Sequence, residues 1–127
     1  MNDHRLHKEL AALTEAYTVR RRSDRLVDLV RFTYPSDWTP QVSTLRYELP
    51  PDYPASAPAV HVPAQMAYQG EQDITRKKPS RFDGWDRWCV RFGWEPRRHT
   101  LVSTTRQMME SLSDPAKFRI GQEPEDR

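Results

Sequence analysis

Cys89 is the candidate nucleophile of this sequence, and it is the only cysteine among 127 residues. A lone cysteine cannot form an intramolecular disulfide or a thiolate-rich zinc site, and the four histidines are scattered, so we expect no metal site. A cysteine thiolate is a strong nucleophile and a good leaving group, which suits it to carrying acyl groups. The alternative is that Cys89 is a small buried side chain, a common fate of free cysteines.

Side chains close to Cys89 in the sequence could assist such chemistry. Three cations would stabilise a thiolate if the fold brings them near: Arg87, Arg91 and Arg97. A developing oxyanion would need hydrogen-bond donors. Backbone amides next to the cysteine could supply them, as could three side chains: Tyr68, Arg91 and His99. His99 stands at the start of a predicted helix, where it could serve the oxyanion or shuttle a proton. The alternative for His99 is an ordinary histidine at a helix start.

The elements that must position these residues follow from hydrophobic periodicity. A helix of about four turns is predicted near the N-terminus by four apolar residues at helical spacing: Leu6, Leu10, Leu13 and Tyr17. Two β-prone segments, 17–20 and 26–34, predict a hairpin. Strict alternation over 44–49 and the short apolar run at 59–62 predict two further strands.

The later part of the chain is predicted to carry the site. Residues 64–88 show no sustained periodicity, which indicates a long loop leading to Cys89. The helical period then returns in four residues: Leu101, Thr105, Met108 and Leu112. Asp114-Pro115 should end this helix. Three tryptophans are expected to pack in the core beneath the cysteine: Trp85, Trp88 and Trp94.

These elements together predict an α+β fold. It comprises an N-terminal helix, a four-stranded antiparallel meander, a long active-site loop and a C-terminal helix. We expect one domain over residues 1–120 and a flexible tail over 121–127.

Composition excludes some classes of protein. No apolar run approaches the ~20 residues of a membrane helix, and the N-terminus lacks the apolar core of a secretory signal, so we expect a cytoplasmic protein with no membrane partner. Twenty basic and eighteen acidic residues give a net charge of +2, too balanced to indicate nucleic acid. Basic clusters at 20–22, 76–78 and 97–98 are interpreted as solvated strand ends and loops. A nucleic-acid adaptor is therefore only a third hypothesis, and we expect no nucleic-acid partner.

Four motifs in this order resemble the ubiquitin-conjugating enzyme family. The first is a basic opening helix at 5–10, and the second is the strand end and proline turn at 49–54, followed by Pro58-Ala59-Val60. The third is the segment Trp88-Cys89-Val90, followed by Trp94-Glu95-Pro96. The fourth is the helix that ends at 113–115. The family's His-Pro-Asn ahead of the cysteine is missing, and Asn2 is the only asparagine. The pattern is therefore more similar to divergent bacterial ubiquitin-conjugating-like families found in conjugation and antiphage operons.

The resemblance implies a function and a set of partners. Cys89 would accept a ubiquitin-like modifier from an activating enzyme as a thioester and pass it to an amine on a protein substrate, without a cofactor. Arg5 and Lys8 on the first helix would bind the activating enzyme, although a solvated helix face explains them equally well. The missing asparagine favours an alternative: an inactive member of the fold that binds a ubiquitin-like protein or a complex subunit.

Overall fold

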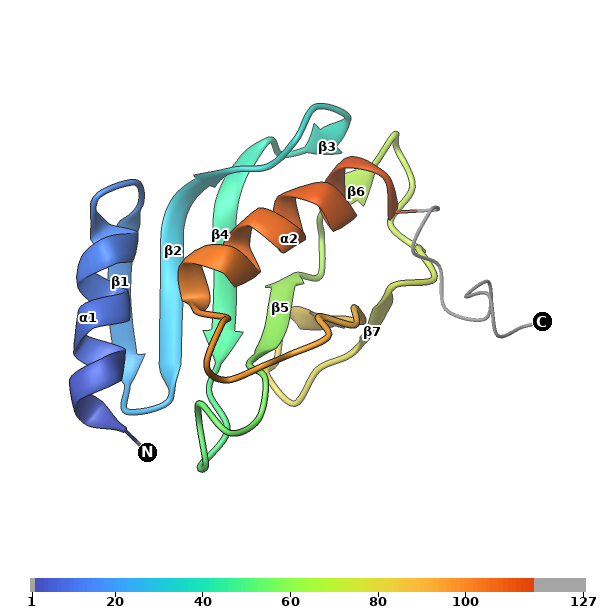
Figure 1. Cartoon of the computed structure of the whole chain (residues 1–127). Coiled ribbons are helices and arrows are strands. Elements are labelled where there is room, and N and C mark those ends of the chain that lie inside the picture. Colours follow the sequence, from blue (N-terminus) through green and yellow to red (C-terminus); the bar gives the residue numbers. More distant parts are fainter. Residues whose placement is uncertain (1, 116–127) are drawn as a thin grey trace.

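The described part of the chain folds as two helices, a main antiparallel sheet and a small second sheet (Figure 1). The structure is a computed structural model, and it describes residues 2–115. Helix α1 (Asp3–Thr14) opens the chain and helix α2 (Leu101–Ser113) closes the described part. The main sheet has six strands in the order β1-β2-β4-β5-β8-β7. Their bounds are β1 Thr18–Ser23, β2 Leu26–Thr33, β4 Val42–Glu48, β5 Ala59–Pro63, β8 Trp85–Trp88 and β7 Lys77–Pro79. Strands β3 (Trp38–Thr39) and β6 (Ala67–Tyr68) form a separate two-stranded sheet.

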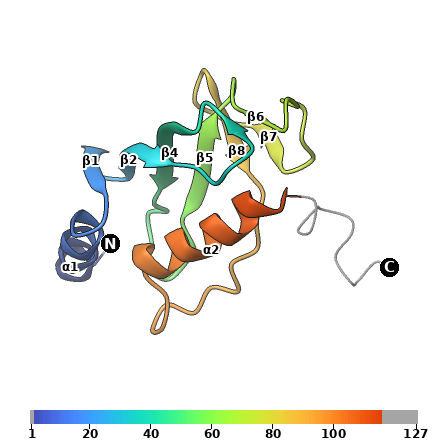
Figure 2. The same cartoon turned by 90° about the horizontal axis from the view of Figure 1, so that it is seen from above.

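Both helices lie on the same side of the main sheet (Figure 2). We call this side the covered face and the opposite side the open face. Helix α1 begins at Asn2, whose side chain accepts a hydrogen bond from the Arg5 amide at 3.0 Å. It buries Leu6 and Leu13 but is shorter than predicted, since Tyr17 lies beyond its end.

Alternation along the strands builds the core on the covered face. Leu45 and Tyr47 of β4 and Val60 and Val62 of β5 are buried there, as the alternating pattern predicted. The predicted stripe of α2 packs against them, and its four members are all buried: Leu101, Thr105, Met108 and Leu112. An irregularity in the β2–β4 pairing falls between Leu29 and Phe32 and shifts the phase, so that both side chains are buried although three positions apart.

The α+β class and the order helix, sheet, helix are confirmed, but the expected four-stranded meander is incomplete. The four expected strands exist as β1, β2, β4 and β5, and β8 and β7 extend the sheet beyond β5. The expected loop at 64–88 therefore contains β6, β7 and β8. These strands are two to four residues long and partly polar, too short for a period-two pattern to be visible. The predicted tail at 121–127 and the end of the domain at residue 120 lie outside the described residues.

Neither helix of the described segment is long and apolar enough to cross a membrane.

Candidate functional site around Cys89

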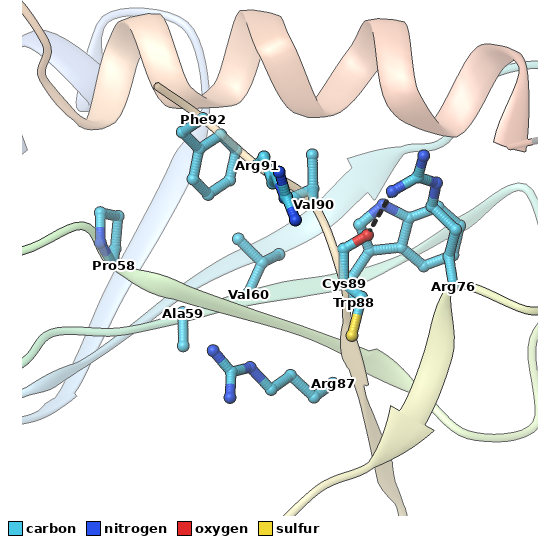
Figure 3. A pocket seen from close by; sticks show the side chains of 10 residues that line it. All are labelled: Pro58, Ala59, Val60, Arg76, Arg87, Trp88, Cys89, Val90, Arg91 and Phe92. Carbon is cyan, nitrogen blue, oxygen red and sulfur yellow. Dashed lines mark hydrogen bonds between the residues drawn. The ribbon is translucent and has the colours of Figure 1, made fainter. Parts of the chain in front are cut away.

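Cys89 directly follows β8, and the alternation of that strand decides which way it faces. Trp88 points into the core, where it is 2% exposed and its indole N–H donates to the Ser111 hydroxyl at 2.9 Å. The neighbours of Trp88 on either side turn away from the helices. Figure 3 shows the sulfur of Cys89 and the side chain of Arg87 on the side away from α2. The thiol is free and half-buried, so the tryptophan beneath it does not seal it off.

The thiol borders an open cavity of about 200 Å³. One part of its wall is apolar and comes from the start of β5 and the segment after β8: Pro58, Ala59, Val60, Val90 and Phe92. The other part is cationic and consists of three arginines: Arg76, Arg87 and Arg91. An apolar wall with a few charged groups is typical of ligand-binding sites.

Arg76 holds the backbone of Cys89 from both sides. Its carbonyl accepts the Cys89 amide at 2.8 Å, and its guanidinium Nη1 donates to the Cys89 carbonyl at 2.6 Å. A further hydrogen bond runs from Nε to the carbonyl of Pro115 at 3.3 Å. Arg76 is only 3% exposed. It is therefore a positioning residue for the cysteine rather than a reacting group.

The interpretation of the cluster 76–78 as solvated was wrong for two of its three residues. Arg76 is buried, and the side chain of Lys77 is also 3% exposed. The ammonium of Lys77 donates to the carbonyls of Ala64 and Met66, each at 2.8 Å. Only Lys78 is exposed. The sequence signal was ambiguous, because a run of basic residues does not show which ones find backbone acceptors.

The structure places His99 at the start of α2, as predicted, but not in the lining of the Cys89 cavity. Its Nδ1 accepts the backbone N–H of Glu95 at 2.8 Å, and its ring packs on that of Trp94. Its carbonyl accepts a hydrogen bond from Arg5, which also donates to the carbonyl of Pro96. One of its two ring nitrogens, Nδ1, is thus already engaged locally.

Arg5 and Lys8, the two expected contacts for an activating enzyme, differ in their surroundings. Arg5 is half-buried and ties α1 to the segment before α2, and its Nε also donates to the carboxylate of Glu9 at 2.6 Å. Glu9 in turn accepts the Tyr53 hydroxyl at 2.6 Å and the Leu101 amide at 2.7 Å. Lys8 is exposed on α1. Of the two residues, only Lys8 presents a side chain free for a partner.

The other residues predicted to assist Cys89 also differ in whether they reach the cavity. Arg87 and Arg91 border the cavity, whereas Arg97 and Tyr68 do not. The Tyr68 ring lies against Trp38 and its hydroxyl donates to the Ser113 carbonyl at 3.4 Å. Arg91 is therefore the predicted side-chain donor that the fold brings to the cavity.

Of the three tryptophans expected to pack in the core beneath the cysteine, Trp88 is buried there, Trp94 is partly buried against the core, and Trp85 is not part of it. Trp94 is half-buried near the start of α2, where its indole donates to the Pro54 carbonyl at 2.7 Å. Trp85 is also half-buried, and the guanidinium of Arg46 lies 4.2 Å from the centre of its ring. The alternation of β8 explains this, because Trp85 and Trp88 are three positions apart and face opposite sides.

A second polar cluster, which the sequence did not reveal, centres on the buried His61 of β5. Its Nε2 lies 3.0 Å from a Glu48 carboxylate oxygen and its Nδ1 lies 2.9 Å from the Ser80 hydroxyl. Burial lowers the pKa of His61, and the hydrogen bond to Glu48 opposes this only in part. The ring is thus neutral near pH 7, donating to Glu48 and accepting from Ser80. A strand over 59–62 puts His61 on the face opposite Val60 and Val62, and this was the signal that could have found it.

Among residues 2–115, no group of three or more histidine, cysteine, aspartate or glutamate side chains comes together as a metal site. Comparison of the chain with protein-family models, curated proteins and solved structures found no match. The functional interpretation therefore depends on the residues and geometry of this chain.

Proposed function

We propose that the protein is a ubiquitin-conjugating-type acyl transferase, of the kind found in bacterial conjugation and antiphage pathways, with Cys89 as its nucleophile. The observation that carries the proposal is the free, half-buried thiol that borders the cavity, on a segment with the Trp-x-Pro and helix that resemble the family. A sulfur sealed beneath Trp88 would have opposed it. The order of helix, antiparallel sheet and helix agrees with the resemblance.

The reaction has two steps that balance without a cofactor. In the first, the Cys89 thiolate attacks the carbonyl carbon of the thioester that links the modifier to its activating enzyme. The new C–S bond forms, and the enzyme's own cysteine leaves as a thiolate. In the second, an amine of the protein substrate attacks the same carbon, Cys89 leaves as a thiolate, and the nitrogen gives up one proton. The product is an amide bond.

The residues around Cys89 would contribute position and charge. Arg76 fixes the backbone on which the sulfur is carried, through the two hydrogen bonds described above. Arg87 and Arg91 border the cavity and would stabilise the thiolate and the oxyanion that forms on the carbonyl. The apolar wall from Pro58 to Phe92 would hold the extended C-terminus of the modifier. Lys8, exposed on α1, would contact the activating enzyme.

One observation favours the alternative, a binding module without catalysis. The family's asparagine is absent, and the histidine that could replace it, His99, accepts a hydrogen bond from Glu95 instead. If neither Arg91 nor a backbone amide takes over the oxyanion, the chain could still bind a ubiquitin-like protein. The two hypotheses differ in whether Cys89 is required.

The experiment that tests the proposal is thioester formation. The protein is incubated with ATP, an activating enzyme and a ubiquitin-like modifier, and the products are separated with and without thiol reductant. We expect an adduct that reductant cleaves. Cys89→Ala should abolish it, and Cys89→Ser should give a slower adduct that resists reductant.

A matched control is Arg106→Ala, which removes an exposed charge on α2 and should leave the adduct unchanged. If no adduct forms while wild type and Cys89→Ala bind the modifier equally well, the chain is a binding module and the enzyme proposal is wrong.

A further inference from the structure

The open face of the main sheet carries one polar residue from every strand in a single row. The strand pairings align Arg20 of β1 with Asp28 of β2, Asp28 with Arg46 of β4, and Arg46 with His61 of β5. They continue from His61 to Arg87 of β8, and from Arg87 to Lys78 of β7. Directly paired residues of neighbouring strands point to the same side of a sheet. We call these six residues the open-face row.

Positive charge dominates this row and its edges. Arg20, Arg46, Arg87 and Lys78 belong to the row. Arg22 pairs with its one acidic member, Asp28, and Arg81 pairs with Glu48, which lies beside the row on the same face. Two carboxylates on the face, those of Asp28 and Glu48, are each paired with an arginine. Asp28 is 1% exposed and paired with Arg22 and Arg46 at 3.0 and 2.8 Å, and Glu48 is paired with Arg81 at 2.7 Å.

Three cations of the row have no ionic partner in the described part of the chain: Arg20, Lys78 and Arg87. All three are exposed. Since the whole chain has a net charge of only +2, the excess on this face is balanced by acidic residues elsewhere. A surface with concentrated positive charge attracts anionic ligands. Within residues 2–115, no acidic side chain forms an ion pair with these three cations.

Two aromatic side chains lie on the same face. Trp85 and Phe82 are half-buried, with the guanidinium of Arg46 4.2 and 5.1 Å from their ring centres, and Arg81 lies 4.2 Å from the ring centre of Phe82. Proteins that bind single-stranded nucleic acid combine cationic side chains that follow the backbone with aromatic side chains that contact the bases. The row spans five strand spacings, or about 24 Å, which is long enough for several nucleotides.

We propose that the open face binds single-stranded nucleic acid, with phosphates along Arg20, Arg87 and Lys78 and bases against Phe82 and Trp85. The overall charge had argued against such a partner, but it averages over faces that differ. The helices cover one face of the sheet, so the excess positive charge of the row is presented on the open face. This proposal does not rest on the thioester chemistry of Cys89.

The test is fluorescence anisotropy with labelled 20-nucleotide oligo(U) and oligo(dT) at several salt concentrations. The triple variant R20A/K78A/R87A removes cations that have no ionic partner, so it leaves no buried charge unpaired. Each phosphate contact in a single strand contributes about −0.7 to the slope of log affinity against log salt. The variant should therefore flatten the slope by about 2 and weaken binding at least tenfold at low salt.

The matched control is R97A/R98A/R106A, which removes the same charge from the exposed surface around the start of α2. It should bind like wild type. Equal weakening by both variants would overturn the proposal, as would wild-type binding that is insensitive to salt. If polyglutamate competes as well as oligo(U), the partner is an acidic protein and the proposal is wrong.

Two further arms keep the result interpretable. Unfolding in urea verifies that the triple variant is folded, and Lys78→Glu alone replaces it if it is not. Cys89→Ala should bind oligo(U) like wild type, so that failure of the thioester reaction and failure of nucleic-acid binding are separate outcomes.

Discussion

The two faces of the main sheet are built from the same strands, but one carries buried apolar side chains and the other carries charged and polar ones. On the covered face, residues such as Leu45, Val60 and Trp88 are buried against α2 and contribute apolar contacts. On the open face, the residues beside them in sequence are ionic or polar, as in Arg46 and His61. Trp88 and Cys89 are adjacent in the chain, yet one anchors the core and the other borders a cavity.

This difference shows how a small domain separates stability from chemistry. Strand alternation places consecutive residues in different environments without any change of backbone. The covered face can therefore be packed tightly, while the open face keeps exposed charge and a free thiol. The predictions below test whether the two faces are in fact independent.

The largest expected effect is on the covered face. Trp88→Ala removes a buried indole and its hydrogen bond to Ser111, and should lower the free energy of unfolding by about 3–5 kcal/mol. Cys89→Ala, one residue along, should change it by less than about 1 kcal/mol. Urea denaturation of both variants measures the contrast. Similar losses in the two would mean that Cys89 is part of the core.

The next effect concerns the ionic network of the open face. Asp28→Asn takes a carboxylate from between Arg22 and Arg46 and should cost about 2 kcal/mol, because the guanidinium of Arg46 is largely buried and loses its partner. Asp24→Asn, in the exposed turn between β1 and β2, is the control and should stay within about 0.5 kcal/mol of wild type. Equal effects would show that the network adds nothing to stability.

A smaller effect is expected for the reactivity of the thiol. Because Cys89 is the only cysteine and is half-buried, iodoacetamide should label it in the native protein at a rate within about tenfold of that in urea. Mass spectrometry follows the single label over time. Protection of a hundredfold or more would place the sulfur with the core and contradict the contrast between Trp88 and Cys89.

The smallest effect is a pH dependence that arises on the open face. Burial lowers the pKa of His61 from 6.5 in the folded state, so the unfolded chain binds its proton more readily. The contribution of neutral His61 to the free energy of unfolding is therefore fully present above pH 6.5. It falls as the pH drops from 6.5 towards the folded-state pKa of His61. The carboxylate of Glu48, although partly buried, has its pKa lowered from 4.5 by hydrogen bonds from Arg81 and His61, so its contribution is lost only below pH 4.5.

Urea midpoints at pH 7.5 and 5.5 therefore isolate the histidine from Glu48. The midpoint should be lower at pH 5.5 in wild type, and His61→Gln should reduce this difference. His7→Gln, which replaces an exposed histidine on α1, serves as the control. A difference that persists in full in His61→Gln would assign the pH dependence to another group.

The sequence could predict what depends on local periodicity. The alternation of Leu45 and Tyr47 and the stripe through Met108 and Leu112 identified the covered face correctly. It could not predict β7, since Lys77-Lys78-Pro79 has no apolar alternation and pairs only because β8 lies beside it. Short polar strands of this kind are decided by tertiary contacts.

The candidate site likewise has one part that the sequence could predict and one that it could not. The position of Cys89 shortly before a helix was visible in the motif, but the strand β8 ahead of it was not, because the sequence indicated a loop there. The role of Arg76 was not, because a guanidinium that reaches a carbonyl thirteen residues away leaves no local pattern. The open-face row was hidden for the same reason. Its members are spread from Arg20 to Arg87 in sequence, and only the strand register brings them into line.

The twin hydrogen bonds of Arg5 to the carbonyls of Pro96 and His99 have a consequence for chain length between β8 and α2. Arg76 holds the other end of this segment through its hydrogen bond to the Cys89 carbonyl, and the Trp94 indole hydrogen-bonds to Pro54 between the two ends. We call residues 89–99 the strap. No other atom lies within 4 Å of the position that a Cβ would take at Gly93, so the segment is not packed there. Evolution could lengthen the strap there and reshape the rim of the cavity, whereas an insertion between Pro96 and His99 would pull apart two carbonyls that a single guanidinium spans.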